Sequence, residues 1–147
     1  MKIQNTLVAV NKARVKDLTS LKNNQEKYLG KNLDALKKVA AEMKKVDKKY
    51  VKTKEAFGSE DSVLNAHYLR VAKAALDECV AEYNELTHNI NGTMDSLKVV
   101  YEDLNRAIAA VDAEKAAKGA NDFHHFNNKI SDKLNKVKNS LTGYPHY

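Results

Sequence analysis

The sequence predicts an all-α protein, arranged as an up-down bundle of four to five amphipathic helices. Apolar residues recur three and four apart through most of the chain, which is the period of one helix face. The only proline, Pro145, lies near the C-terminus. Stretches of roughly 25 to 30 residues are separated by glycine, which favours helix ends because it reaches the left-handed conformation without strain. The five glycines are Gly30, Gly58, Gly92, Gly119 and Gly143.

The first two stretches differ in the strength of their apolar stripe. In the first, Val8, Val15 and Leu18 share a face that polar residues interrupt. The second carries an apolar residue at every seventh position, the spacing of a coiled-coil seam. These positions are Leu29, Leu36, Met43, Tyr50 and Phe57.

The remaining three stretches each carry a regular stripe with spacings of three and four residues. The third contains Leu69, Ala72, Leu76, Cys79, Tyr83, Leu86 and Ile90. The fourth contains Met94, Leu97, Tyr101, Leu104, Ile108 and Val111. The last contains Phe123, Phe126, Ile130, Leu134, Val137 and Leu141.

Helix boundaries are predicted most firmly at two glycines. Gly58 is followed by Ser59 as a helix cap and by acidic residues in the next first turn. Gly119 is likewise followed by Asn121 as a helix cap and by Asp122 in the first turn of the next helix. The last helix is expected to end at Gly143, since the following proline cannot continue it.

The other two glycines leave two architectures open. Weak helix formers before Gly92, and Asn32 as a cap after Gly30, favour breaks at both positions and therefore the bundle. If both glycines lie inside helices, the chain instead forms a long antiparallel coiled-coil hairpin with a short C-terminal helix. In either case we expect one helical domain over residues 1–142 and an aromatic tail over residues 143–147.

The sign of the charge changes along the chain. Residues 1–57 carry 15 Lys and Arg against 6 Asp and Glu, whereas residues 58–118 carry 6 against 11. Residues 119–147 carry 4 against 2. We interpret this layout as internal complementarity, in which the basic first half packs against the acidic second half and the flanking charges set the pairing.

An alternative interpretation is that a lysine-rich stretch binds a polyanion, either nucleic acid or an anionic surface. Arg14 is the one arginine in the first half, and Tyr50 is the one aromatic residue among the lysines, so specific base recognition is not predicted. The candidate lysines are Lys37, Lys38, Lys44, Lys45, Lys48, Lys49, Lys52 and Lys54.

Metal binding and catalysis find little support in the sequence. Carboxylate-x-x-His spacings resemble those of di-iron bundles, but the pairs are incomplete and their members largely avoid the apolar stripes. The residues concerned are Glu82, Glu85, His88, Asp122 and His125. Cys79 lies on an apolar stripe and is interpreted as a structural thiol. We therefore expect no catalytic residue, no cofactor and no metal, and place a helical-bundle enzyme or metal protein third among the functions considered.

The function predicted first is structural: a non-catalytic protein that works through helix–helix contacts, by self-association or with another helical protein. A component of a larger particle, such as a virion, a tail or a filament, is the class of assembly considered. The N-terminus lacks the apolar run of a signal peptide, and no stretch reaches the roughly 18 apolar residues of a membrane span. We expect synthesis in the cytoplasm, with or without packaging into an assembly.

The last amphipathic stretch is the predicted partner-binding surface. Its stripe concentrates large apolar residues that an isolated helix cannot keep in water. The competing interpretation is that this helix completes the core of its own chain. The residues concerned are Phe123, Phe126, Ile130, Leu134, Val137 and Leu141, together with Tyr144 and Tyr147 of the tail.

Overall fold

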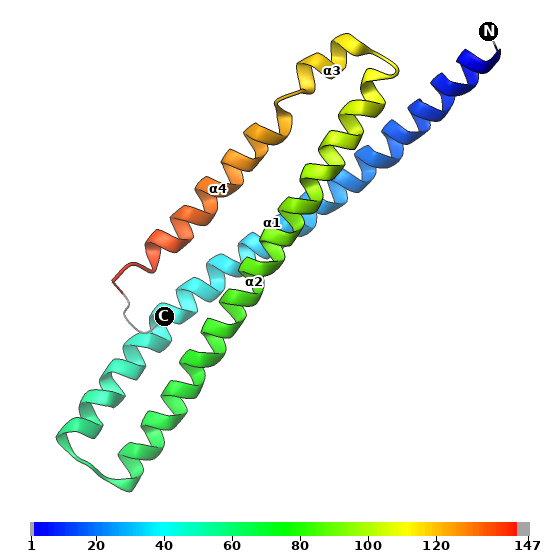
Figure 1. The fold of residues 1–147 in the computed structure, drawn as a ribbon. Coiled ribbons are helices and arrows are strands. Elements are labelled where there is room, and N and C mark those ends of the chain that lie inside the picture. Colours follow the sequence, from blue (N-terminus) through cyan, green and yellow to red (C-terminus); the bar gives the residue numbers. More distant parts are fainter. Residues whose placement is uncertain (1, 144–147) are drawn as a thin grey trace. The chain divides into compact units, whose positions relative to one another are not determined.

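The computed structural model describes residues 2–143, with side chains from residue 6 onward. It contains four helices, α1 (Lys2–Ser59), α2 (Val63–Ala109), α3 (Ala113–Gly119) and α4 (Asp122–Ser140), as Figure 1 shows. No strand occurs within residues 2–143, so the predicted all-α class is confirmed.

The chain divides into two compact units, which are described separately below. Unit 1 comprises Met1–Lys31 and Ile90–Lys133, and unit 2 comprises Asn32–Asn89 and Leu134–Tyr147. Three helices, α1, α2 and α4, each run without interruption from one unit into the other. The expected single domain over residues 1–142 therefore stays a prediction.

The preferred bundle of four to five helices is wrong in its helix lengths, because Gly30 and Gly92 lie inside α1 and α2. Both lack the positive φ that would end a helix, which among the described glycines belongs to Gly143. A glycine inside a helix costs about 1 kcal/mol. Burial of a large apolar side chain contributes about 1.5–3 kcal/mol, and Leu29 and Ile90, close to the two glycines, are fully buried. Continuous helices keep these stripes in phase, and the lengths of α1 and α2 are those that the hairpin alternative requires.

The predicted breaks near Gly58 and Gly119 are confirmed, with one change of capping residue. Ser62, not Ser59, caps α2: its Oγ accepts a hydrogen bond of 3.0 Å from the backbone N–H of Asn65. The Asn65 side-chain amide donates to the carbonyl oxygen of Glu60 at 2.9 Å, which fixes the turn between α1 and α2.

A further break, at residues 110–112, was not predicted. The stripe of the fourth stretch continues to Val111, but α2 ends at Ala109. Asp112 has extended backbone geometry and its side chain accepts a hydrogen bond from the backbone N–H of Lys115, so it caps α3. An aspartate that satisfies free N–H groups at a helix start stabilises a new helix there.

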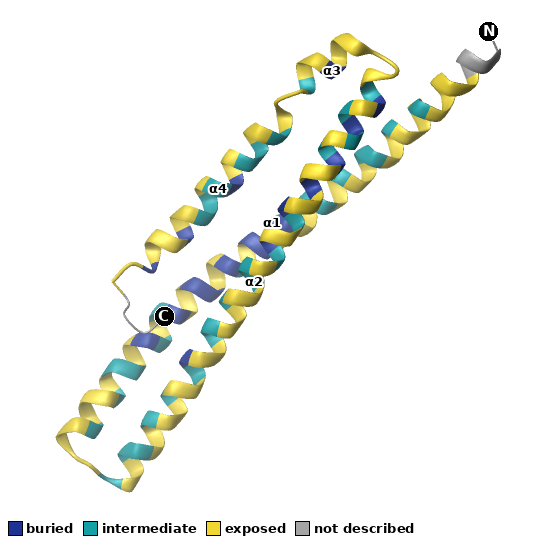
Figure 2. Ribbon diagram, viewed as in Figure 1, coloured by how far each residue is buried: buried dark blue, intermediate teal, exposed yellow. Residues whose placement is uncertain are grey.

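The buried core is unevenly distributed along unit 2. Its buried apolar residues are Leu33, Leu36, Val39, Ala40, Met43, Leu76, Val137 and Leu141. From there to the turn the helices bury almost nothing: Asp47 is the one buried residue between Met43 and Leu76, a stretch described in full. Figure 2 shows the change from buried to exposed and intermediate residues along α1 and α2 toward their turn. This end of the hairpin leaves apolar surface uncovered.

Substitution of alanine for Gly30 or Gly92 is expected to raise the free energy of unfolding by about 0.5–1 kcal/mol. Alanine restricts the unfolded chain more than glycine does, and a Cβ atom at either position meets nothing within 4 Å. Urea unfolding followed by circular dichroism measures the change. Gly143→Ala is the control and is expected to destabilise, because its φ of 93° disfavours a side chain. A loss of stability at Gly30 and Gly92 as well would contradict continuous helices.

Candidate functional site

A groove of about 630 Å³ runs between α1 and α2 near their turn, entirely within unit 2. Apolar side chains form much of its surface, while Lys49 and Lys52 belong to its α1 wall. Its lining residues are Glu42, Val46, Lys49, Lys52, Thr53 and Ala56 from α1, and Asn65, Tyr68, Val71, Ala72 and Ala75 from α2.

The groove exists because each helix carries a second stripe beside its buried seam. On α1 the lining residues include positions 42, 46, 49, 53 and 56, and on α2 the positions 64, 68, 71 and 75 follow the same alternation of four and three. That alternation is the spacing of a helix-packing seam. Leu64 is 58% exposed, Tyr68 52% and Val71 55%. The sequence alone does not single out this stripe, because the neighbouring one, through Leu69 and Leu76, is more strongly apolar.

The same α2 stripe changes character farther along the helix. After Ala75 the next positions with this spacing are Glu78, Glu82 and Glu85, all exposed. One face of α2 is therefore apolar over positions 64 to 75 and acidic over positions 78 to 85.

The eight candidate lysines all lie on α1 within unit 2, and seven of them are exposed while Lys44 is half-buried. No ion pair joins any of them to a carboxylate among the described residues. Two ion pairs occur among the described residues, and each lies within one helix: Lys73 with Asp77, and Arg106 with Asp103. The expected pairs between the basic and acidic halves are absent from the described part of the chain.

The predicted partner-binding stripe on α4 is largely covered by the chain itself. Ile130, Val137 and Leu141 are buried, and Phe123, Phe126 and Leu134 are half-buried. The buried side chains are not available to a partner while α4 holds its place, which favours the alternative that this helix completes the core. Tyr144 and Tyr147 lie outside the described residues.

Tyr101 organises an aromatic cluster in unit 1. Its ring centroid lies 5.4 Å from that of Phe123 and 5.9 Å from that of Phe126. Its hydroxyl donates a hydrogen bond to Glu26 Oε1, and the Lys22 Nζ atom lies 4.9 Å from its ring centroid. Burial, followed by the hydrogen bond to Glu26, raises the pKa of Tyr101 far above its usual value. Through these contacts the start of α4 packs against α1 and α2.

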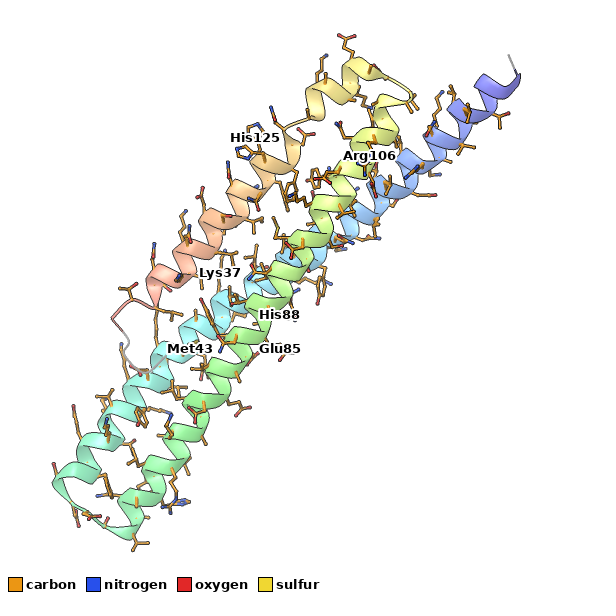
Figure 3. All side chains as sticks on the ribbon, viewed as in Figure 1. Lys37, Met43, Glu85, His88, Arg106 and His125 are labelled. Carbon is orange, nitrogen blue, oxygen red and sulfur yellow. The ribbon has the colours of Figure 1, made fainter. Side chains whose placement is uncertain are left out.

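The residues considered for metal binding do not form a ligand set in the described chain. Glu82, Glu85 and His88 are exposed on α2, where Figure 3 labels the last two. Asp122 and His125 are exposed at the start of α4. Within the described residues no three His, Cys, Asp or Glu side chains gather closely enough to hold a metal ion.

Cys79 is half-buried and its thiol is poorly suited to nucleophilic chemistry. Burial raises the pKa of the Cys79 thiol, and nearby glutamates, Glu42 foremost, raise it further. A higher pKa lowers the fraction of reactive thiolate at neutral pH. This agrees with the interpretation of Cys79 as a structural residue.

No helix in the described range is both long and apolar enough to cross a bilayer. Comparison with protein-family models, with curated proteins and with solved structures gave no match.

Proposed function

We propose that this chain is a non-catalytic structural protein that self-assembles through the unit 2 groove, with α2 of a second copy as the occupant. The observation that supports this most directly is the apolar groove near the turn, where the lining residues Tyr68 and Val71 are each more than half exposed. Leu64, 58% exposed, continues the same α2 stripe beyond the lining residues. Contiguous apolar surface of this kind is characteristic of protein–protein contacts. A component of a virion, a tail or a filament is the class of assembly we propose for it.

A second copy is favoured over an unrelated partner because the chain complements its own groove. The exposed apolar part of the α2 stripe matches the apolar groove surface, of which Tyr68 and Val71 are themselves part. Two copies related by a two-fold axis exchange the same surfaces, so one sequence pattern forms both halves of the contact. Each copy contributes few large apolar side chains to the contact. We therefore expect the dimer interface to bury a small surface area.

Replacement of Val71 with Lys is expected to abolish the dimer. It introduces a positive charge among the apolar side chains of the groove. The α1 wall of the same groove already carries Lys49 and Lys52. Sedimentation equilibrium of the full chain at 10 to several hundred micromolar protein measures the effect. The unmodified chain is expected to approach twice the monomer mass of 16.5 kDa at the highest concentrations.

Val99→Lys is the matched control. Val99 also lies on α2 and is 54% exposed, against 55% for Val71, but it does not line the groove. The control is expected to dimerise like the unmodified chain. A monomer at every concentration, or equal weakening by both substitutions, would exclude the groove as the assembly contact.

A further inference from the structure

Seven of the eight candidate lysines form one continuous basic face on α1. At 100° per residue, a helix places these seven within an arc of about 140°. Lys54 lies well outside this arc. The basic face consists of Lys37, Lys38, Lys44, Lys45, Lys48, Lys49 and Lys52.

The basic face is almost purely lysine. Between residues 37 and 52, the one other residue in the arc is Ala41. The two acidic residues of this stretch, Glu42 and Asp47, fall outside it, and Asp47 is buried. No carboxylate among the described residues forms an ion pair with these lysines. Exposed Asp34 and Glu55 lie beyond the two ends of this stretch, and exposed Glu42 lies at the edge of the arc. The face therefore concentrates positive charge over positions 37 to 52 with carboxylates only at its borders.

The side chains missing from the face narrow the class of polyanion. A helix that binds a membrane surface inserts apolar or aromatic anchors beside its lysines, and the arc offers only Ala41. Binding to single strands relies on aromatic residues on which bases stack, and the arc contains none. Arginine, the main reader of base edges, is also absent from it. With these three modes disfavoured, the lysines of the face fit contacts with the regular phosphate backbone of a duplex.

We propose that the basic face of α1 binds the phosphate backbone of duplex nucleic acid without sequence preference. Residues 37 to 52 span about 22 Å of helix axis, and a duplex presents one negative charge per roughly 1.7 Å of its axis. Each lysine that neutralises a phosphate releases condensed counterions, so the affinity depends steeply on salt. The basic face shares Lys49 and Lys52 with the groove wall, whereas its other five lysines do not line the groove. Duplex binding is therefore measured at protein concentrations below those at which the chain assembles.

The test is fluorescence anisotropy of the full chain with a labelled 20-base-pair DNA duplex, titrated at several salt concentrations. If all seven lysines contact phosphates, the slope of log K against log salt is about −6. The triple variant Lys37→Gln, Lys45→Gln, Lys48→Gln removes three exposed lysines that do not line the groove. Its slope is expected to be shallower by about 3, and its affinity at 0.1 M salt at least about tenfold weaker.

A second triple variant, Lys98→Gln, Lys118→Gln, Lys129→Gln, is the control. It removes the same net charge from exposed positions outside the basic face, and it is expected to bind the duplex nearly as the unmodified chain does. A duplex of different base composition is expected to bind equally well. The proposal is overturned if the duplex does not bind at 50 mM salt, or if both triple variants weaken binding equally. It is also overturned if vesicles containing 30% phosphatidylserine bind and the duplex does not.

Discussion

Replacement of Leu36 with Ala is expected to lower the free energy of unfolding by about 2–5 kcal/mol. Leu36 lies on the buried stripe of α1 in unit 2, and its side chain is 1% exposed. The substitution removes buried apolar surface and leaves a cavity that two long helices cannot close by a small shift, since each is held along its length. Urea unfolding followed by circular dichroism, at protein concentrations below those used for assembly, measures the loss.

Leu64→Ala is the control for Leu36→Ala, because it deletes the same atoms from the same unit. Leu64 is 58% exposed, so its truncation is expected to change stability by no more than about 0.5 kcal/mol. It is expected to weaken self-association instead, because Leu64 belongs to the exposed α2 stripe. Equal destabilisation by the two substitutions would contradict the assignment of one stripe to the core and the other to the surface.

Replacement of Tyr101 with Ala is expected to destabilise the chain by about 3 kcal/mol. It removes the ring that contacts Phe123 and Phe126, and it leaves the half-buried Glu26 without its hydrogen-bond donor. Urea unfolding measures the loss. Tyr68→Ala is the control: Tyr68 is 52% exposed in the groove, so its effect on stability is expected to stay within about 0.5 kcal/mol.

Tyr101→Phe removes the hydroxyl and keeps the ring, so it distinguishes the contributions of the two groups. Loss of the bond to Glu26 is expected to cost about 1–2 kcal/mol at neutral pH. The raised pKa of Tyr101 means that the folded chain holds this proton more tightly than the unfolded chain. Its contribution to stability is therefore complete below the unfolded pKa of about 10 and declines as pH rises above it toward the folded pKa.

Two measurements test this pH dependence. The difference in stability between the unmodified chain and Tyr101→Phe is expected to shrink steadily above about pH 10. Absorbance of tyrosinate at alkaline pH is expected to show one tyrosine of the seven in the sequence that ionises last, and Tyr101→Phe is expected to lack that step. A difference in stability that grows with alkaline pH would refute the stated environment of Tyr101.

The local features of this fold could be read from sequence because they depend on neighbours along the chain. Spacings of three and four residues predicted helices throughout, and helix ends near Gly58 and Gly119 followed from glycine beside polar capping residues. The basic face was likewise present in the spacing of the lysines, since the helical period alone places Lys37, Lys45 and Lys48 on one side.

Helix continuity and the choice of covered stripes required tertiary structure. The helical cost of Gly30 and Gly92 is small and local, whereas the gain that outweighs it comes from packing partners distant in sequence. Glu26 and Tyr101, 75 residues apart, meet only after the helices pack. Packing also buries Ile130, Val137 and Leu141 of the α4 stripe, whereas Tyr68 and Val71 stay exposed in the groove. The sequence by itself determined the helices and the faces each one carries. The tertiary structure decided which apolar faces are buried and which remain exposed, because burial depends on long-range contacts that a helical period does not encode.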